Sequence, residues 1–234
     1  MKTLAGTAEQ PEYDMNSSSD VEPKKASASY IHDLLRDRIC SLEYRPGHML
    51  RENDVSAEFS VSRTPVREAF QRLSLAGLVE IRNGIGTFVT QFDSEQIESV
   101  FQFRSEMAAL IGRMQTRDAT DDDIKILEAL LERARKLKDR FDVDEHWKIN
   151  HELHFAISSL VLNPAFLEVW HNLYFQAARA WYDVSRLISA DAIRLLCSEI
   201  TELLTALTEN DRAAIGSIRR NYINYFRRRI VDVA

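Results

Sequence analysis

The clearest chemistry in the sequence lies in a short run of hydroxyl and guanidinium side chains, Ser62-Arg63-Thr64, followed by Arg67. Arg63 and Arg67 are four residues apart, so on a helix they share one face. A guanidinium can donate two parallel hydrogen bonds to a guanine edge or to a phosphate. The hydroxyl groups of Ser62 and Thr64 can cap the helix or bind phosphate. The run therefore predicts a helix whose N-terminal end contacts double-stranded DNA.

The residues around this run predict the helices that would position it. Helical spacing of apolar residues begins at Ser29 and stops at Arg45-Pro46-Gly47. A second short helix is expected over 52–60, and a third from the 62–64 run to about Ala76, where Gly77 can end it. The buried face of the third helix is expected to consist of Val66, Ala69, Phe70 and Leu73.

Three short strands complete the expected DNA-binding unit. We expect them over 49–51, 78–81 and 87–89, with Asn83-Gly84 as the turn between the last two. Gly84 at the tip would let the backbone approach DNA closely. A helix, two further helices and a hairpin, in this order, predict a winged helix-turn-helix over residues 29–91 with a small β-wing.

The rest of the chain, 92–234, predicts an antiparallel all-α bundle, so the fold class is mainly α. Six helices are expected, over about 94–116, 121–139, 143–161, 164–187, 191–208 and 211–232. Their expected caps are Ser94, Thr120, Asp142, Asn163 and Asn210. Short connections between helices of this length indicate antiparallel neighbours.

Composition limits the class of protein. The net charge of −6 gives no support for DNA binding, and residues 29–91 hold eight arginines against eight acidic residues. Two isolated cysteines make no disulfide framework, and no stretch reaches the roughly 18 apolar residues of a membrane span. We expect a cytoplasmic protein without a membrane partner. Residues 1–28 read as a disordered arm, either a solvated tail or an arm that reaches the minor groove.

The segment Val61-Ser-Arg-Thr-Pro-Val-Arg-Glu-Ala-Phe-Gln-Arg-Leu-Ser-Leu-Ala-Gly-Leu-Val-Glu closely resembles the signature of GntR-family regulators. The resemblance spans about residues 30–91 and includes the Asn-Gly turn. It implies a transcription regulator that binds a palindromic operator as a homodimer. Many members carry a DNA-contacting arginine in the second helix, and this sequence has Asn53 there, with Arg51 two residues before it. Asparagine can still contact adenine.

A GntR-type head followed by an all-α domain resembles the FadR-type branch with its FCD effector domain. The resemblance implies a small organic acid or related metabolite as effector, and a metal held by an Asp or Asn, a His four residues later, and two further histidines. The first pair falls on Asn150 and His154, but the later positions hold Ile200 and Tyr222. Isoleucine cannot bind a metal and a phenol replaces imidazole poorly. We therefore expect no metal and no other cofactor, with Asn150 and His154 as residual ligands only.

Without a metal, the effector would contact the protein directly. Arg104 matches an arginine of the first FCD helix that often faces the cavity in the family. We expect it to bind the effector together with Asn150, His154, Arg179 and Tyr222, although each could instead belong to the core or the surface.

The leading hypothesis is a ligand-responsive transcription regulator that acts as a repressor and is not an enzyme. A metal-dependent all-α enzyme is an alternative, but the sequence offers at most two ligands and contains no nucleophile elbow, phosphate loop or paired-cysteine site. A ligand-blind DNA-binding protein is the other alternative. A screen of organic acids separates it from a sensor.

Overall fold

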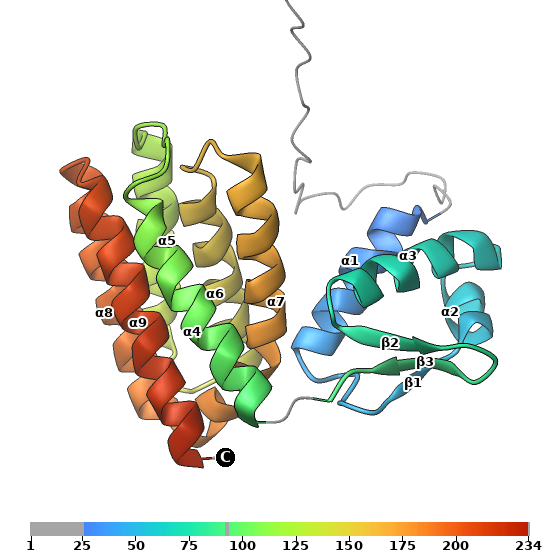
Figure 1. The fold of residues 1–234 in the computed structure, drawn as a ribbon. Coiled ribbons are helices and arrows are strands. Elements are labelled where there is room, and N and C mark those ends of the chain that lie inside the picture. The colour runs from blue at the N-terminus through green and yellow to red at the C-terminus, as the bar shows by residue number, and fades with distance from the viewer. Residues whose placement is uncertain (1–25, 92–93, 234) are drawn as a thin grey trace, which may run out of the picture.

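The computed structural model describes residues 26–91 and 94–233, so most of the predicted arm, residues 1–25, lies outside the described residues. Two bodies lie side by side, a small head with one sheet and a larger helical bundle (Figure 1). The fold is mainly α with an N-terminal winged helix-turn-helix, as the sequence predicts. None of the described helices is long and apolar enough to cross a membrane.

The head follows the predicted order of elements. It consists of α1 (Ala28–Cys40), β1 (Met49–Leu50), α2 (Glu52–Glu58), α3 (Arg63–Leu75), β2 (Val79–Arg82) and β3 (Gly86–Val89). The sheet is antiparallel with the order β1-β3-β2, and Ile81 pairs with Thr87. The predicted apolar face of α3 is fully buried, with Val66 and Leu73 at 0% exposure. This core holds α3 against α1 and leaves the N-terminal end of α3 in solvent.

Local signals account for the ends of the head helices. Ser27 caps α1 by accepting a hydrogen bond from the Tyr30 backbone, so this helix starts one residue before the predicted start. Ser62 occupies the N-cap position of α3, but its hydroxyl makes no capping hydrogen bond. Gly77 and Gly84 have positive φ angles of 72° and 74°, which glycine adopts without strain. The hydroxyl of Ser62 therefore stays available to another partner.

The bundle contains six helices within the described residues. They are α4 (Ser94–Ile111), α5 (Asp121–Lys136), α6 (Val143–Ser158), α7 (Pro164–Leu187), α8 (Ser189–Thr208) and α9 (Arg212–Val233). Thr120, Asp142 and Asn163 cap α5, α6 and α7 through their side chains, as expected. The expected cap at Asn210 is wrong, because Asn210 has a φ of 52° and Asp211 accepts the capping bond from Ala214 instead.

Helices α4 and α9 lie side by side at very close range (Figure 1). A Cβ on Gly112 would lie 2.7 Å from the Arg212 carbonyl oxygen, and one on Gly216 would lie 3.0 Å from the Ala108 carbonyl oxygen. Only hydrogen fits at both positions, so glycine here serves the helix packing. The predicted first bundle helix over 94–116 stops at Ile111, just before this contact.

A charged cap holds the start of α5. The Asp123 carboxylate accepts hydrogen bonds from Arg117 at 2.6 and 2.7 Å and from the Thr120 backbone at 2.8 Å. The Arg117 hydrogen bonds hold the pKa of Asp123 well below its usual range. The carboxylate is therefore ionised, and stabilising, at neutral pH.

We expect Asp123→Asn to lower the free energy of unfolding by about 1–3 kcal/mol at pH 7, because it removes charged hydrogen bonds from a helix cap. Urea denaturation measures the change. Asp121→Asn, which changes an exposed acid in the same helical turn, is the matched control. Equal stability of the two variants would contradict the role assigned to Asp123.

Candidate DNA-binding face and effector cavity

An open groove in the head lies between the start of α2, the start of α3 and the hairpin. Its lining includes Arg51, Asn53, Arg63 and Gly84, four of the residues predicted to contact DNA. No side-chain atom lies within 4 Å of a Cβ built on Gly84, so the hairpin tip is open. The head thus brings together residues that are more than 30 positions apart in the sequence.

The other three predicted DNA contacts, Ser62, Thr64 and Arg67, are exposed on the first turns of α3. The Nε of Arg67 donates to both carboxylate oxygens of Glu52, each at 2.9 Å. Glu52 lies at the start of α2 and lines the groove. This ion pair joins Arg67 of α3 to the start of α2, and Arg67 itself is not among the residues that line the groove.

Sequence reasoning missed Arg82, which also lines the groove. Arg82 donates to Glu80 at 2.9 Å, and its guanidinium lies 5.0 Å from the centre of the Phe88 ring. The available signal was the alternation of side chains along a strand, which places residues 80 and 82 on the same face of β2. The groove therefore carries three arginines, Arg51, Arg63 and Arg82.

A small cavity lies in the bundle among α4, α6, α7, α8 and α9. Its volume is about 40 Å³. It is lined by Phe101, Arg104, Asn150, Tyr174, Trp181, Glu199, Arg219, Tyr222, Ile223 and Phe226. Three of the five predicted effector ligands, Arg104, Asn150 and Tyr222, thus meet at one site. This volume holds only a few water-sized groups.

Arg104 is a buried cation of this cavity, only 4% exposed. Its guanidinium lies 5.4 Å from the Trp170 ring centre and 5.1 Å from the Tyr174 ring centre. Within the described residues it makes no salt bridge, and its Nε has no hydrogen-bond partner. Burial, and secondly the charge of Arg219, lower the pKa of Arg104 to about 9. It therefore remains charged at neutral pH.

A buried ion pair forms the opposite side of the cavity. Arg219 of α9 donates to Glu199 of α8 at 2.5 Å, and both side chains are 5% exposed. Burial raises the pKa of Glu199. Sequence reasoning missed both residues. The available signal was that Glu199 interrupts the apolar face formed by Leu196 and Leu203, where an unpaired acid would be costly.

The residues at the positions of the family's metal ligands do not fit a metal ion. The Nε2 of His154 is hydrogen bonded to Nδ1 of His171 at 2.8 Å, and His154 does not line the cavity. Ile200 is fully buried, and the Tyr222 hydroxyl donates to Glu202 at 2.6 Å. No group of three metal-binding side chains occurs in the part of the chain that is described. Two guanidinium groups at the cavity would repel a divalent cation.

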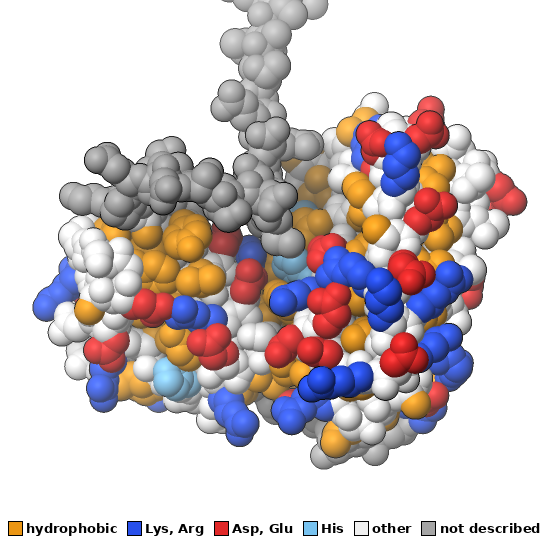
Figure 2. Space-filling model, turned by 180° about the vertical axis from the view of Figure 1, so that it is seen from behind, with side chains coloured by type: hydrophobic (Ala, Val, Ile, Leu, Met, Phe, Trp, Pro, Cys, Tyr) orange, Lys and Arg blue, Asp and Glu red, His pale blue; other side chains and the backbone are white. Residues whose placement is uncertain are grey.

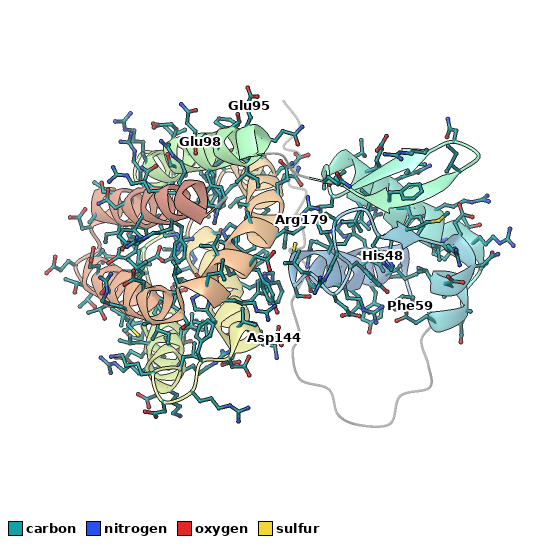
Figure 3. The ribbon with its side chains drawn as sticks, turned by 90° about the horizontal axis from the view of Figure 1, so that it is seen from below. His48, Phe59, Glu95, Glu98, Asp144 and Arg179 are labelled. Carbon is teal, nitrogen blue, oxygen red and sulfur yellow. The ribbon has the colours of Figure 1, made fainter. Side chains whose placement is uncertain are left out.

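Arg179 lies elsewhere than predicted. It does not line the cavity but points from α7 toward the head (Figure 3), where it donates to the Thr90 carbonyl oxygen at 2.8 Å. Arg179 and Tyr174 are five positions apart on α7, so they point about 140° apart around the helix. The expectation that Arg179 binds the effector therefore does not agree with its position.

Charges elsewhere on the bundle are mixed. Basic and acidic side chains alternate over the bundle on the face that Figure 2 shows. Several pair directly, as Arg133 does with Glu145 at 2.7 Å and with Glu152 at 2.6 Å. A surface of this kind offers no single-sign field for a polyanion. The head groove is lined by three arginines and by two acidic residues, Glu52 and Asp54.

Comparisons with known proteins identify both parts of the chain. The model of bacterial regulatory proteins of the gntR family matches residues 28–89, and the FCD domain model matches residues 99–224. The chain belongs to the GntR family. Its C-terminal part is an FCD domain, so the resemblance drawn from the signature segment and the following helices is confirmed. Proteins of this family are transcription regulators.

Relatives and solved structures agree. The chain is 26% identical over 204 residues to the HTH-type transcriptional repressor RspR of Escherichia coli, covering 86% of this chain and 87% of that protein. It is 28% identical over 177 residues to the Nta operon transcriptional regulator of Aminobacter aminovorans, covering 74% and 81%. The structure of E. coli McbR/YncC has the same fold, with a TM-score of 0.73 at 18% identity and coverage of 92% and 97%.

Proposed function

We propose that this GntR regulator is a ligand-responsive repressor. Its head binds a palindromic operator as part of a homodimer in the cytoplasm. A small organic acid bound in the FCD cavity controls that binding. The repressor named RspR, which matches most of the chain, supports the sign of regulation. The observation that carries the ligand class is the buried charge around Arg104, because Arg104 and Arg219 share a single buried carboxylate, Glu199, which is hydrogen bonded to Arg219.

The physical argument for an organic acid is charge balance. Two buried guanidinium groups, Arg104 and Arg219, face one buried carboxylate, Glu199, and the uncompensated positive charge is destabilising by several kcal/mol. A carboxylate restores the balance and matches the planar fork of the guanidinium. Asn150 and Tyr222 line the same cavity and can supply further polar contacts. The volume of about 40 Å³ favours an acid of a few carbons that binds without a metal.

A thermal-shift screen tests the ligand class. We expect acetate, lactate or pyruvate to raise the melting temperature of the wild-type chain, also after dialysis against EDTA. Arg104→Met should abolish the shift, whereas Arg113→Met, at an exposed position beyond the end of α4, should keep it. A shift that survives in Arg104→Met would contradict the proposed contact. Absence of any shift in the wild type would favour a ligand-blind DNA-binding protein.

Arg67 is expected to contact the operator. We predict that Arg67→Ala weakens binding to the DNA selected by the wild type from a random pool by about 1–3 kcal/mol at fixed salt. Arg194→Ala is the matched control, since Arg194 has nearly the same exposure (61% against 60%) and also pairs with an acid, Asp191. Fluorescence anisotropy measures both. Equal affinities of the two variants would remove Arg67 from the DNA-binding face.

A further inference from the structure

The head is held against the bundle by three residues of α7, which we call the α7 clasp: Phe175, Gln176 and Arg179. The Phe175 carbonyl oxygen accepts a hydrogen bond from Cys40 of α1 at 3.5 Å. The Gln176 side chain donates to the Ala76 carbonyl oxygen at 3.0 Å. Arg179 donates to the carbonyl oxygen of Thr90 at 2.8 Å and to its hydroxyl at 3.1 Å.

Two of these contacts meet at the C-terminal end of α3. Ala76 is the C-cap residue of α3, so Gln176 binds a carbonyl at the end of that helix. The Thr90 hydroxyl, which Arg179 contacts, lies 2.8 Å from the Gly77 carbonyl oxygen. A Cβ on Gly77 would lie 3.4 Å from the Gln176 amide nitrogen. The turn that ends α3 is thus packed directly against α7.

The opposite end of α3 carries the DNA-binding residues. Helix α3 has 13 residues, which corresponds to a rigid rod about 20 Å long. Arg63 lines the head groove at one end and Ala76 contacts α7 at the other. A change at the C-terminal end therefore turns the whole helix relative to the bundle.

The same stretch of α7 reaches the effector cavity. Tyr174, the neighbour of Phe175, lines the cavity, where the Arg104 guanidinium lies 5.1 Å from its ring centre. The His154 ring stacks on Tyr174 at 3.9 Å between centres. On the head side, the Arg36 guanidinium of α1 lies 4.1 Å from the Phe175 ring centre. Consecutive residues of one helix thus contact the cavity and the head.

We propose that Gln176 and Arg179 are positioning residues for DNA recognition, and that they set the direction of α3 relative to the FCD domain. In a dimer, this direction determines the spacing between the two recognition helices, and so the operator spacing that both can bind. A ligand beside Arg104 would reach the clasp through Tyr174. This regulatory step rests on the proposed function. The positioning role of Gln176 and Arg179 rests only on their hydrogen bonds to the head.

The experiment uses the full chain and three variants. Gln176→Leu/Arg179→Met removes both side-chain donors of the clasp, and Arg179→Lys keeps a donor. Gln102→Leu/Arg113→Met makes the same substitutions at exposed positions in the α4 region and is the matched control. DNA selected by the wild type is then offered as a single half-site and as paired half-sites at a series of spacings.

We expect the double clasp variant to lose at least about tenfold in affinity for the preferred spacing, because heads whose orientation is less fixed engage paired sites less effectively. Its affinity for the single half-site should stay within about twofold of the wild type. The control and Arg179→Lys should keep the spacing preference. An unchanged spacing preference in the double variant would overturn the proposal, and so would an equal loss of half-site binding, which indicates a damaged head.

Hydrogen exchange separates failure of this proposal from failure of the proposed function. If the wild type selects no DNA, the proposed function is wrong. Hydrogen exchange then tests by itself whether the clasp holds the end of α3. We expect faster exchange of the Gly77 and Leu78 amides in the double clasp variant and unchanged exchange in α5 and α8. Equal exchange at residues 77 and 78 in the wild type and the variant would overturn the clasp.

Discussion

Glu199→Leu should lower the free energy of unfolding by about 3–5 kcal/mol, because it leaves Arg219 buried without its anion. The pair is joined at 2.5 Å with both side chains 5% exposed. Burial, and secondly the charge of Arg219, already lower the pKa of Arg104, and the substitution would leave both guanidinium groups in the cavity without the Glu199 carboxylate. Guanidinium chloride denaturation at pH 7 measures the loss.

The double variant Glu199→Leu/Arg219→Met serves as the control, since apolar residues of similar size often replace a buried ion pair at little cost. We expect it to recover most of the lost stability. We also expect acetate to stabilise Glu199→Leu more than the wild type, because the vacant anion position favours a carboxylate. A double variant as unstable as the single one would show that packing, and not charge, sets the cost.

Lowering the pH from 6.5 to 4 should destabilise the bundle by several kcal/mol. Four histidines, His146, His151, His154 and His171, are largely buried, and burial is the main cause that lowers the pKa of each. The values are about 4 for His146, about 3 for His151 and about 4 for His171. Below pH 6.5 the unfolded chain therefore binds protons that the native chain does not.

The sign follows from this difference, since stability falls as the pH drops wherever the unfolded state binds more protons. Each histidine contributes up to about 1.4 kcal/mol per pH unit below 6.5, until its native pKa is reached. Urea denaturation at pH 7.5, 6.5, 5.5 and 4.5 measures the slope. His146→Leu, at a position with 0% exposure, should reduce the slope by about one proton.

The exposed His48 provides the control through His48→Gln. The slope of this variant should follow that of the wild type, because the effect comes from the bundle. A flat stability profile between pH 6.5 and 4.5 in the wild type would contradict the buried, neutral state of the four rings.

Most helices and turns of the head could be predicted from residues close to them in the sequence. The run from Ser62 to Arg67, Gly77 after the helix and Asn83-Gly84 at the turn lie within a few positions of the elements they define, and the structure has those elements where expected. Helix caps at Thr120 and Asn163 are equally local. Capping, turn formation and helical periodicity depend on contacts within about four residues, so a single sequence displays them.

The cavity beside Arg104 was only partly predictable from the sequence. The family pattern pointed to Arg104, Asn150 and Tyr222, and these three lie together. That Arg104 makes no salt bridge within the described residues, while Glu199 pairs with Arg219, depends on which side chains every neighbouring helix directs into the cavity. Glu199 and Arg219 come from different helices, 20 positions apart. Such pairs form only when helix rotation and packing are set, which local periodicity does not determine.

Arg179 shows the same division. The sequence by itself determined that the residue lies on a long helix beside aromatic side chains, and it determined the DNA-binding head and the FCD type of bundle. Only the tertiary structure decided that Arg179 turns toward Thr90 of the head, while Tyr174 faces the cavity. The reason is geometric: rotation about α7 is set by the elements packed against it, which come from distant parts of the chain.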